Sequence, residues 1–204
     1  MSEPVAATVD VAFTLEGAAL PREHRALLAD ALEQVAPWLA LAPGAGVHGL
    51  KLPEGGDGES VPLPRRARLL LRVPRELAAR LGRLAGEVLV VGAHRVRLGP
   101  WVQRELLPHR TLYAHFVASA GRDELAFLDD VDAELRAMGV RCLRICGRAR
   151  ELRDGAQRIA GFGLMLDALT PEASLQVQDV GLGAHRRLGC GLFVPHRSAA
   201  AVGG

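Results

Sequence analysis

Residues 111–118, TLYAHFVA, alternate apolar with polar or small side chains, and this alternation predicts a β-strand. Residues 122–138 follow with apolar side chains at helical spacing, and Gly139 stands where a left-handed cap ends a helix. The next elements are predicted as strands at 140–146 and 158–167, a helix from Thr170 to about Val180, and a last strand at 192–195. This β-α-β-β-α-β order is that of a ferredoxin-like module.

The N-terminal half of the chain has the same order. Its elements are predicted as a strand at 7–15, a helix opened by Pro21 and ended near Pro37, an extended stretch at 47–52, a strand at 67–73, a helix at 75–85 and a hairpin or bent strand at 87–98. The sequence therefore predicts an α+β protein of two tandem ferredoxin-like modules. We expect the modules at 1–99 and 111–197, a linker at 100–110 and a disordered tail at 198–204.

Composition narrows the class of protein. The chain has 204 residues, of which 49% are hydrophobic, enough for one large or two small cores. It lacks both a continuous apolar run of about 18 residues and a basic segment leading into an apolar core, so we expect neither a membrane span nor a signal peptide. Three cysteines, Cys142, Cys146 and Cys190, cannot all pair, which favours a reducing, cytoplasmic location.

The basic residues suggest a nucleic-acid partner through their type and position. The formal net charge is only +2, but Lys51 is the only lysine among 25 basic residues. Arginine grips phosphate with a planar, two-pronged group, although a GC-rich genome would also favour arginine. A local basic cluster is the stronger signal. It comprises Arg141, Arg144, Arg148, Arg150, Arg153 and Arg158, in a region predicted to be largely a loop between two strands.

The most distinctive motif is GLGAHRRLGCGLFVP, residues 181–195. A G-x-G pair can mark a dinucleotide loop, but such a loop needs a strand before it and a helix after it, and here the order is reversed. We therefore expect no nucleotide cofactor. Four glycines around a basic centre instead allow positive φ and close approach of the backbone to a phosphate. The predicted RNA-binding residues of this glycine-rich loop are Gly181, Gly183, His185, Arg186, Arg187, Gly189 and Gly191.

The glycine-rich loop before the last strand of a second ferredoxin-like module resembles the RAMP superfamily of CRISPR proteins. Within it, the chain is similar to the repeat-RNA endoribonucleases of the Cas-six family, over roughly residues 7–197, and LPREHRALLADAL (20–32) resembles that family's first helix. The resemblance implies cleavage of CRISPR repeat RNA, as a stem-loop or unstructured repeat, without a metal. In that reaction a ribose 2′-hydroxyl attacks the neighbouring phosphate and leaves a 2′,3′-cyclic phosphate. It also implies other CRISPR effector subunits as partners.

Such cleavage needs a proton acceptor, and a histidine has a suitable pKa. His24 is the first candidate, because the resembled family often places its catalytic histidine on or near the first helix. At helical spacing it aligns with buried positions, so a half-buried structural histidine is the alternative. His48 is the second candidate, with Lys51 three residues later to stabilise charge. The two cysteines at 142 and 146 lack the C-x2-C spacing of zinc sites, so we expect no metal site.

Two other classes of function remain open. A non-catalytic RNA-binding RAMP subunit of a CRISPR effector complex would have the same tandem modules, but it would be expected to carry a large thumb-like insertion. A ferredoxin-like regulatory module would bind no RNA, and the basic glycine-rich loop argues against it.

Overall fold

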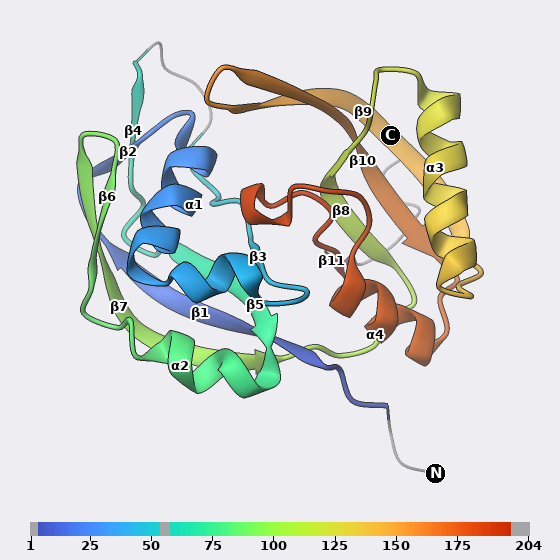
Figure 1. Cartoon of the computed structure of the whole chain (residues 1–204), viewed down its shortest axis with the longest axis horizontal. Coiled ribbons are helices and arrows are strands. Elements are labelled where there is room, and N and C mark those ends of the chain that lie inside the picture. The colour runs from blue at the N-terminus through green and yellow to red at the C-terminus, as the bar shows by residue number, and fades with distance from the viewer. Residues whose placement is uncertain (1–3, 54–57, 197–204) are drawn as a thin grey trace. The chain divides into compact units, whose positions relative to one another are not determined.

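The computed structural model of the chain describes residues 4–53 and 58–196, so the tail predicted at 198–204 lies outside the described residues. The chain forms two compact units (Figure 1). The first, called the N-terminal unit, comprises Thr8–Glu105 together with Arg187–Gly189 from the glycine-rich loop. The second, called the C-terminal unit, comprises Leu106–Arg186, the described residues 190–196 and the described residues 4–7.

The N-terminal unit is built on a five-stranded sheet in the order β3-β5-β1-β7-β6, with a separate ribbon of β2 and β4. The strands are β1 (Thr8–Glu16), β2 (Ala19–Pro21), β3 (Gly46–Val47), β4 (Ser60–Pro62), β5 (Arg68–Pro74), β6 (Val88–Val91) and β7 (His94–Glu105). The helical elements are α1 (His24–Val35), η1 (Pro37–Leu41), η2 (Arg75–Leu77) and α2 (Ala78–Gly82). Without β6, the sheet has the strand order of a ferredoxin-like module.

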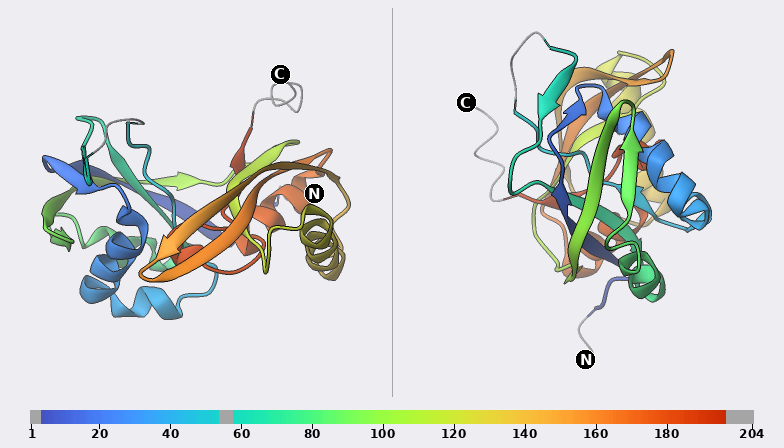
Figure 2. Two further views of the ribbon diagram at one scale, coloured as in Figure 1. Left: turned by 90° about the horizontal axis from the view of Figure 1, so that it is seen from above. Right: turned by 90° about the vertical axis from the view of Figure 1, so that its left-hand side faces the viewer.

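Alternation along β1 determines where the core of this unit lies. Val9, Val11 and Phe13 are fully buried and pack with Leu28 and Leu32 of α1. Because successive strand residues point to opposite faces, Asp10 lies on the face of the sheet away from α1. Figure 2 shows α1 and α2 on the same face of the five-stranded sheet.

A buried charge network crosses the other face. Arg72 on β5 stands directly opposite Asp10 on β1, is fully buried, and donates to both carboxylate oxygens at 2.8 and 3.0 Å. His48, just after β3, contacts the same carboxylate through Nε2 at 3.3 Å. Burial works to raise the pKa of Asp10, but the hydrogen bonds from His48 and Arg72 outweigh it and hold that pKa well below its ordinary value.

The C-terminal unit has a four-stranded sheet in the order β11-β8-β10-β9, again the order of a ferredoxin-like module. Its elements are β8 (Leu112–Ala118), α3 (Glu124–Ala137), β9 (Leu143–Asp154), β10 (Gln157–Asp167), α4 (Pro171–Val180) and β11 (Val194–Pro195), and the turn η3 (Arg186–Leu188) precedes β11. The predicted helix ends are confirmed. Thr170 caps α4 by accepting from the Ala173 amide, and Gly139 follows α3 with a φ of +70°.

Three elements differ from the expectations drawn from the sequence. The arginine cluster is not mainly on a loop, because β9 and β10 form a long hairpin that turns at Gly155. β7 continues to Glu105 through the region expected as a linker, and Pro100 fits there because the pairing with β1 is irregular at that point. Pro21 does not open α1 but ends β2, which pairs with β4, and the helix begins at His24.

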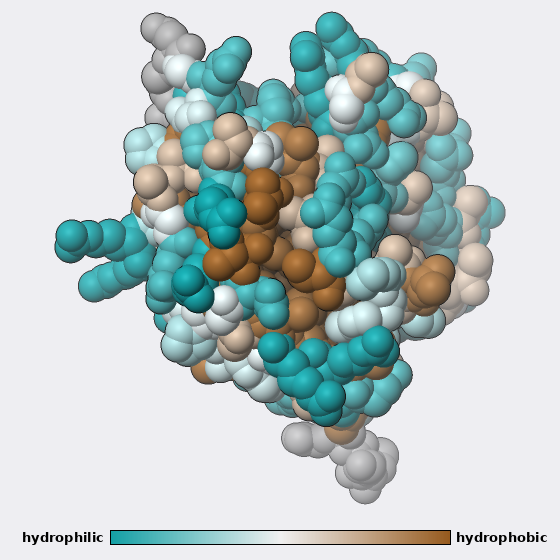
Figure 3. Space-filling model, turned by 60° about the vertical axis from the view of Figure 1, so that its left-hand side comes forward, coloured by the Kyte–Doolittle hydropathy of each residue, from teal (hydrophilic) through white to brown (hydrophobic). Residues whose placement is uncertain are grey.

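No helix among the described residues is long and apolar enough to cross a membrane. Figure 3 shows one face of the molecule, on which apolar surface is surrounded by hydrophilic surface.

The buried network makes Asp10→Asn a strong test of this fold. The substitution should lower the free energy of unfolding by about 3–5 kcal/mol, because Arg72 stays buried without its carboxylate. Urea denaturation at neutral pH measures the effect. Since the folded-state pKa of Asp10 is lowered, its stabilising contribution is complete above the ordinary carboxyl pKa of about 3.9 and is lost as pH falls toward the folded-state value.

The matched control is Glu16→Gln, which neutralises an exposed carboxylate at the end of the same strand. This change should alter the free energy of unfolding by no more than about 0.5 kcal/mol. Equal effects of the two substitutions would contradict a structural role for the buried pair.

Candidate active site

His24 is the first residue of α1 and is only 7% exposed. Its Nδ1 lies 3.1 Å from the backbone carbonyl of Arg22. A carbonyl can only accept, so Nδ1 carries the proton and Nε2 of the neutral ring holds the lone pair. Nε2 is buried and has no hydrogen-bond partner among the described residues. A buried acceptor without a partner is costly in a folded protein, which makes this nitrogen a candidate functional atom.

The surroundings of His24 favour the neutral imidazole. Burial, the main cause, lowers its pKa, and the nearby charge of Arg25 lowers it further, while the hydrogen bond to the Arg22 carbonyl and the charge of Glu23 act in the other direction. The N-terminus of α1 adds positive potential at the same place. A histidine that is neutral near pH 7 can accept a proton, so the site fits a general base.

A small pocket lies beside His24 within the N-terminal unit. Arg25 and Leu28 of α1 border it, as do Gly49 after β3 and Leu188 of the glycine-rich loop. The loop residue is part of this unit because Arg25 Nη1 donates to the Leu188 carbonyl at 2.9 Å. The chain thus brings three distant segments together around one histidine.

The structure gives His48 a different position from His24. The residue borders the same pocket, but its imidazole is bonded to Asp10 on the face of the sheet away from α1. Its side chain therefore belongs to the buried charge network, which gives it a structural role. Lys51 is exposed three residues later. Of the two predicted histidines, His24 is the one with a buried ring nitrogen that has no hydrogen-bond partner among the described residues.

All four glycines of the glycine-rich loop adopt the positive φ values that the motif suggested. The values are +72° at Gly181, +68° at Gly183, +85° at Gly189 and +65° at Gly191. His185 also has a positive φ, +64°, which is uncommon for a residue with a side chain. A side chain at Gly191 would collide with the Leu182 backbone. The loop is therefore a tightly packed structure in which glycine is required.

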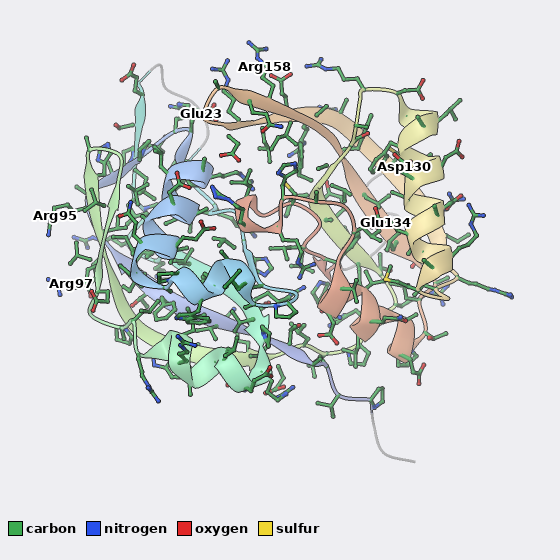
Figure 4. The ribbon with its side chains drawn as sticks, viewed as in Figure 1. Glu23, Arg95, Arg97, Asp130, Glu134 and Arg158 are labelled. Atoms are coloured by element: carbon green, nitrogen blue, oxygen red, sulfur yellow. The ribbon has the colours of Figure 1, made fainter. Side chains whose placement is uncertain are left out.

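The loop amides mostly bond to the protein itself. The Gly181 amide donates to Val177 and closes α4, and the Gly191 amide donates to the Phe116 carbonyl at 2.7 Å. The Gly183 amide donates instead to the Glu134 carboxylate of α3 at 2.9 Å. Figure 4 labels Glu134 on its helix. Of these amides, only that of Gly183 has an anionic, exposed partner of the kind that an RNA phosphate could replace.

The two arginines at the centre of the loop also contact protein groups. Arg186 donates to the carbonyls of Val180 and Asp179 at 2.7 and 3.3 Å. These hydrogen bonds satisfy carbonyl groups at the C-terminal end of α4. Arg187 donates to the Asp30 carboxylate of α1 at 2.7 Å and lies 3.6 Å from Glu33. Both side chains therefore stabilise the loop.

The arginines of the hairpin are more accessible. Arg144 is paired with Asp132, and Arg158 with Glu151 at 3.2 Å. Arg148 and Arg150 are exposed on β9, and neither has an ion-pair partner within the described part of the chain. Arg153 is exposed near the turn, and Figure 4 shows Arg158 at that end of the hairpin. The hairpin thus presents cations along one long strand, suited to a phosphate backbone.

Arg25 and Gly49 border the pocket but were not among the candidates from the sequence. Arg25 was overlooked because it reads as an ordinary helical cation, and Gly49 because one glycine in an extended stretch carries little signal. In residues 4–53 and 58–196, no group of three or more His, Cys, Asp and Glu side chains is placed to hold a metal ion.

Comparison with known proteins agrees with this fold. Residues 9–198 match the family model described as Cas6 Crispr. A CRISPR-associated endonuclease Cas6 from Myxococcus xanthus is 34% identical over 195 residues, which is 95% of this chain and 84% of the relative.

Solved structures share the fold at low sequence identity. A Cas6-related protein from Pyrococcus furiosus has a TM-score of 0.63 at 12% identity and covers 92% of this chain and 98% of its own. A structure titled as a RAMP protein binding different RNA substrates has a TM-score of 0.67 at 12% identity and covers 93% and 100%. The family model and the Myxococcus relative each span nearly the whole chain. The chain therefore belongs to the Cas6 family of CRISPR-associated proteins.

Proposed function

We propose that this chain is an endoribonuclease that cuts CRISPR repeat RNA, with His24 as the general base. The observation that carries the proposal is the buried Nε2 of His24, which has a lone pair, no partner among the described residues and surroundings that favour the neutral ring. The 34% identity to a CRISPR-associated endonuclease supports the reaction class. RNA as the partner is supported by the related fold of a RAMP protein that binds RNA substrates.

In the proposed reaction, Nε2 of His24 takes the proton of a ribose 2′-hydroxyl. The 2′-oxygen forms a bond to the adjacent phosphorus, and the bond from phosphorus to the 5′-oxygen breaks. The products are a 2′,3′-cyclic phosphate and a 5′-hydroxyl, whose leaving oxygen takes a proton from solvent water while His24 later releases its proton to solvent. This internal attack needs proton transfer and charge stabilisation but no metal-bound water.

Nε2 of His24 is shielded from solvent in the structure without RNA. Catalytic hydrogen bonds are often incomplete before the substrate binds, so we expect the pocket to open slightly when RNA enters. Leu188 and Arg187 border this pocket and are the loop residues that such an opening would displace.

His24→Ala should slow single-turnover cleavage by about 10²-fold or more, because it removes the proton acceptor. RNA affinity should change little. His48→Ala is the matched comparison: it removes one hydrogen bond from Asp10, so it should lower stability and leave the folded protein able to cut. If His48→Ala abolishes cleavage and His24→Ala does not, the general base is His48. If both variants cleave normally, a role as an RNA-binding subunit is favoured.

Cleavage should proceed in excess EDTA, because His24 and the ribose itself supply the chemistry. The upstream product should carry a cyclic phosphate, which blocks polyadenylation until it is removed by a phosphatase with cyclic-phosphate activity. Loss of activity in EDTA that magnesium restores, or a free 3′-hydroxyl on the product, would contradict the mechanism.

RNA affinity should depend on the exposed hairpin arginines more than on the loop arginines. Each charged contact to phosphate contributes about 1.5–3 kcal/mol, so Arg148→Ala with Arg150→Ala should weaken repeat-RNA binding by at least about tenfold and reduce its salt dependence. Arg186→Ala with Arg187→Ala should mainly lower thermal stability, because these side chains contact the protein.

The control for charge alone is Arg95→Ala, on β7 of the N-terminal unit. Arg95 is exposed, and Figure 4 shows it on the hairpin of β6 and β7. We expect this change to leave repeat-RNA affinity close to that of the wild type. Losses in proportion to the number of charges removed, in all three variants, would mean that general charge, and not the hairpin, determines binding.

A further inference from the structure

Arg25 follows His24 in the first turn of α1 and is half-buried beside the same pocket. Its guanidinium reaches away from the helix and donates to the carbonyl of Leu188, 163 positions later in the sequence. Together with the pair between Arg187 and Asp30, this hydrogen bond attaches the centre of the glycine-rich loop to the helix that carries His24.

Two glycines make room for this guanidinium. A Cβ placed on Gly49 would lie 2.5 to 2.9 Å from three of the guanidinium atoms, and a Cβ on Gly189 would lie 2.9 Å from Nη1. Such distances are closer than any normal carbon contact, so a side chain at Gly49 would displace the guanidinium. A side chain at Gly189 would also collide with the Val47 carbonyl, at 2.8 Å. Gly189 also needs glycine for its positive φ, but Gly49 has no positive φ. The three atoms nearest to a Cβ at Gly49 all belong to Arg25, so the arginine accounts for the close approach that requires a glycine there.

The same placement acts on His24. The guanidinium is held by the Leu188 carbonyl at a fixed position next to the imidazole, where its charge adds to burial in favouring the neutral ring. Glu23 opposes this effect, and Arg187 and His48 are the other ionisable residues that border the pocket. Arg187 is itself paired with Asp30, and His48 with Asp10.

We propose that Arg25 is a positioning residue for RNA cleavage, which holds the Gly49 segment and the loop centre at Leu188 in place around His24 and keeps His24 ready to accept a proton. This inference rests on the proposed role of His24. Arg25 acts through the pocket and the imidazole and not through a contact with RNA, so its loss should reduce the rate of the chemical step more than the affinity for RNA. A displacement of about 1 Å in such a site can cost about 10²-fold in rate.

The test is single-turnover cleavage of a cognate repeat RNA as a function of pH, with RNA affinity measured in parallel. Arg25→Ala should lower the maximal rate by about 10-fold to 100-fold and leave affinity within about twofold of the wild type. Without the neighbouring charge, the pH at which the rate reaches half its maximum should move upward. Arg25→Lys should keep that midpoint near the wild-type value and recover only part of the rate, because it retains charge without the planar fork.

Gly49→Ala provides an independent test that does not remove the arginine. It should slow cleavage in the wild type, because the new methyl group displaces the guanidinium, and it should have almost no further effect in the Arg25→Ala background. Leu50→Ala, at the next position of the same segment, is the matched control for general disturbance and should slow both backgrounds equally. Thermal melting identifies variants that fail to fold. If Arg25→Ala is one of them, the effect of Gly49→Ala is measured in the Arg25→Lys background instead.

The outcomes separate this inference from the proposed function. If His24→Ala cleaves normally, both are overturned. If His24→Ala is inactive but Arg25→Ala cleaves with the wild-type rate and pH midpoint, only the positioning role is overturned. Loss of affinity in place of rate would make Arg25 an RNA contact, and independent effects of Gly49→Ala and Arg25→Ala would show that the glycine does not serve the arginine.

Discussion

The N-terminal unit depends on one constraint, which is that an arginine with no exposed surface must have a carboxylate beside it. Arg72 and Asp10 meet this requirement across two neighbouring strands, and His48 adds a third member from the end of β3. The pair fixes which residues of β1 and β5 stand opposite each other, because a slip by one position would separate the charges. It also fixes the segment after β3, since Gly49 follows His48 directly. Contacts on the opposite face of the sheet therefore help to position the segment that borders the pocket.

The glycine-rich loop is both a structural turn and a border of the candidate pocket, and its sequence does not distinguish these two roles. Its positive φ values and its contacts with α4 and β8 make it a rigid turn. At the loop centre, the Leu188 carbonyl accepts from Arg25, so that a structural loop also contributes to a candidate catalytic pocket. The hydrogen bond from the Gly183 amide to Glu134 differs from the other loop contacts. Its acceptor is a surface carboxylate, which another anion can replace at little cost.

Much of the architecture could be predicted from the sequence. Alternation identified β1 and β8, Thr170 and Gly139 marked helix ends, and the repeated order predicted two ferredoxin-like sheets. The hairpin of β9 and β10 was underestimated because its outer part is exposed and lacks an apolar face, so the alternation that identifies a strand is missing. The partnership of Asp10 with Arg72 was also not readable, since nothing in either strand indicates which residue lies opposite. For the candidate site, resemblance to a family suggested His24, whereas Arg25 and Gly49 become informative only when their distance is known.

The guanidinium of Arg25 occupies space left by glycines at two positions 140 residues apart, and this has a consequence for how the family can diverge. Loss of Arg25 would remove the contacts that a Cβ at Gly49 would make with its guanidinium. An arginine lost from the helix would free Gly49 to acquire a side chain, whereas Gly189 would still be limited by its positive φ and by the Val47 carbonyl. A side chain gained at Gly49 would be tolerated only where the arginine has already been replaced by a smaller residue. Evolution should therefore exchange Arg25 and Gly49 as a pair, with the loss of the arginine coming first.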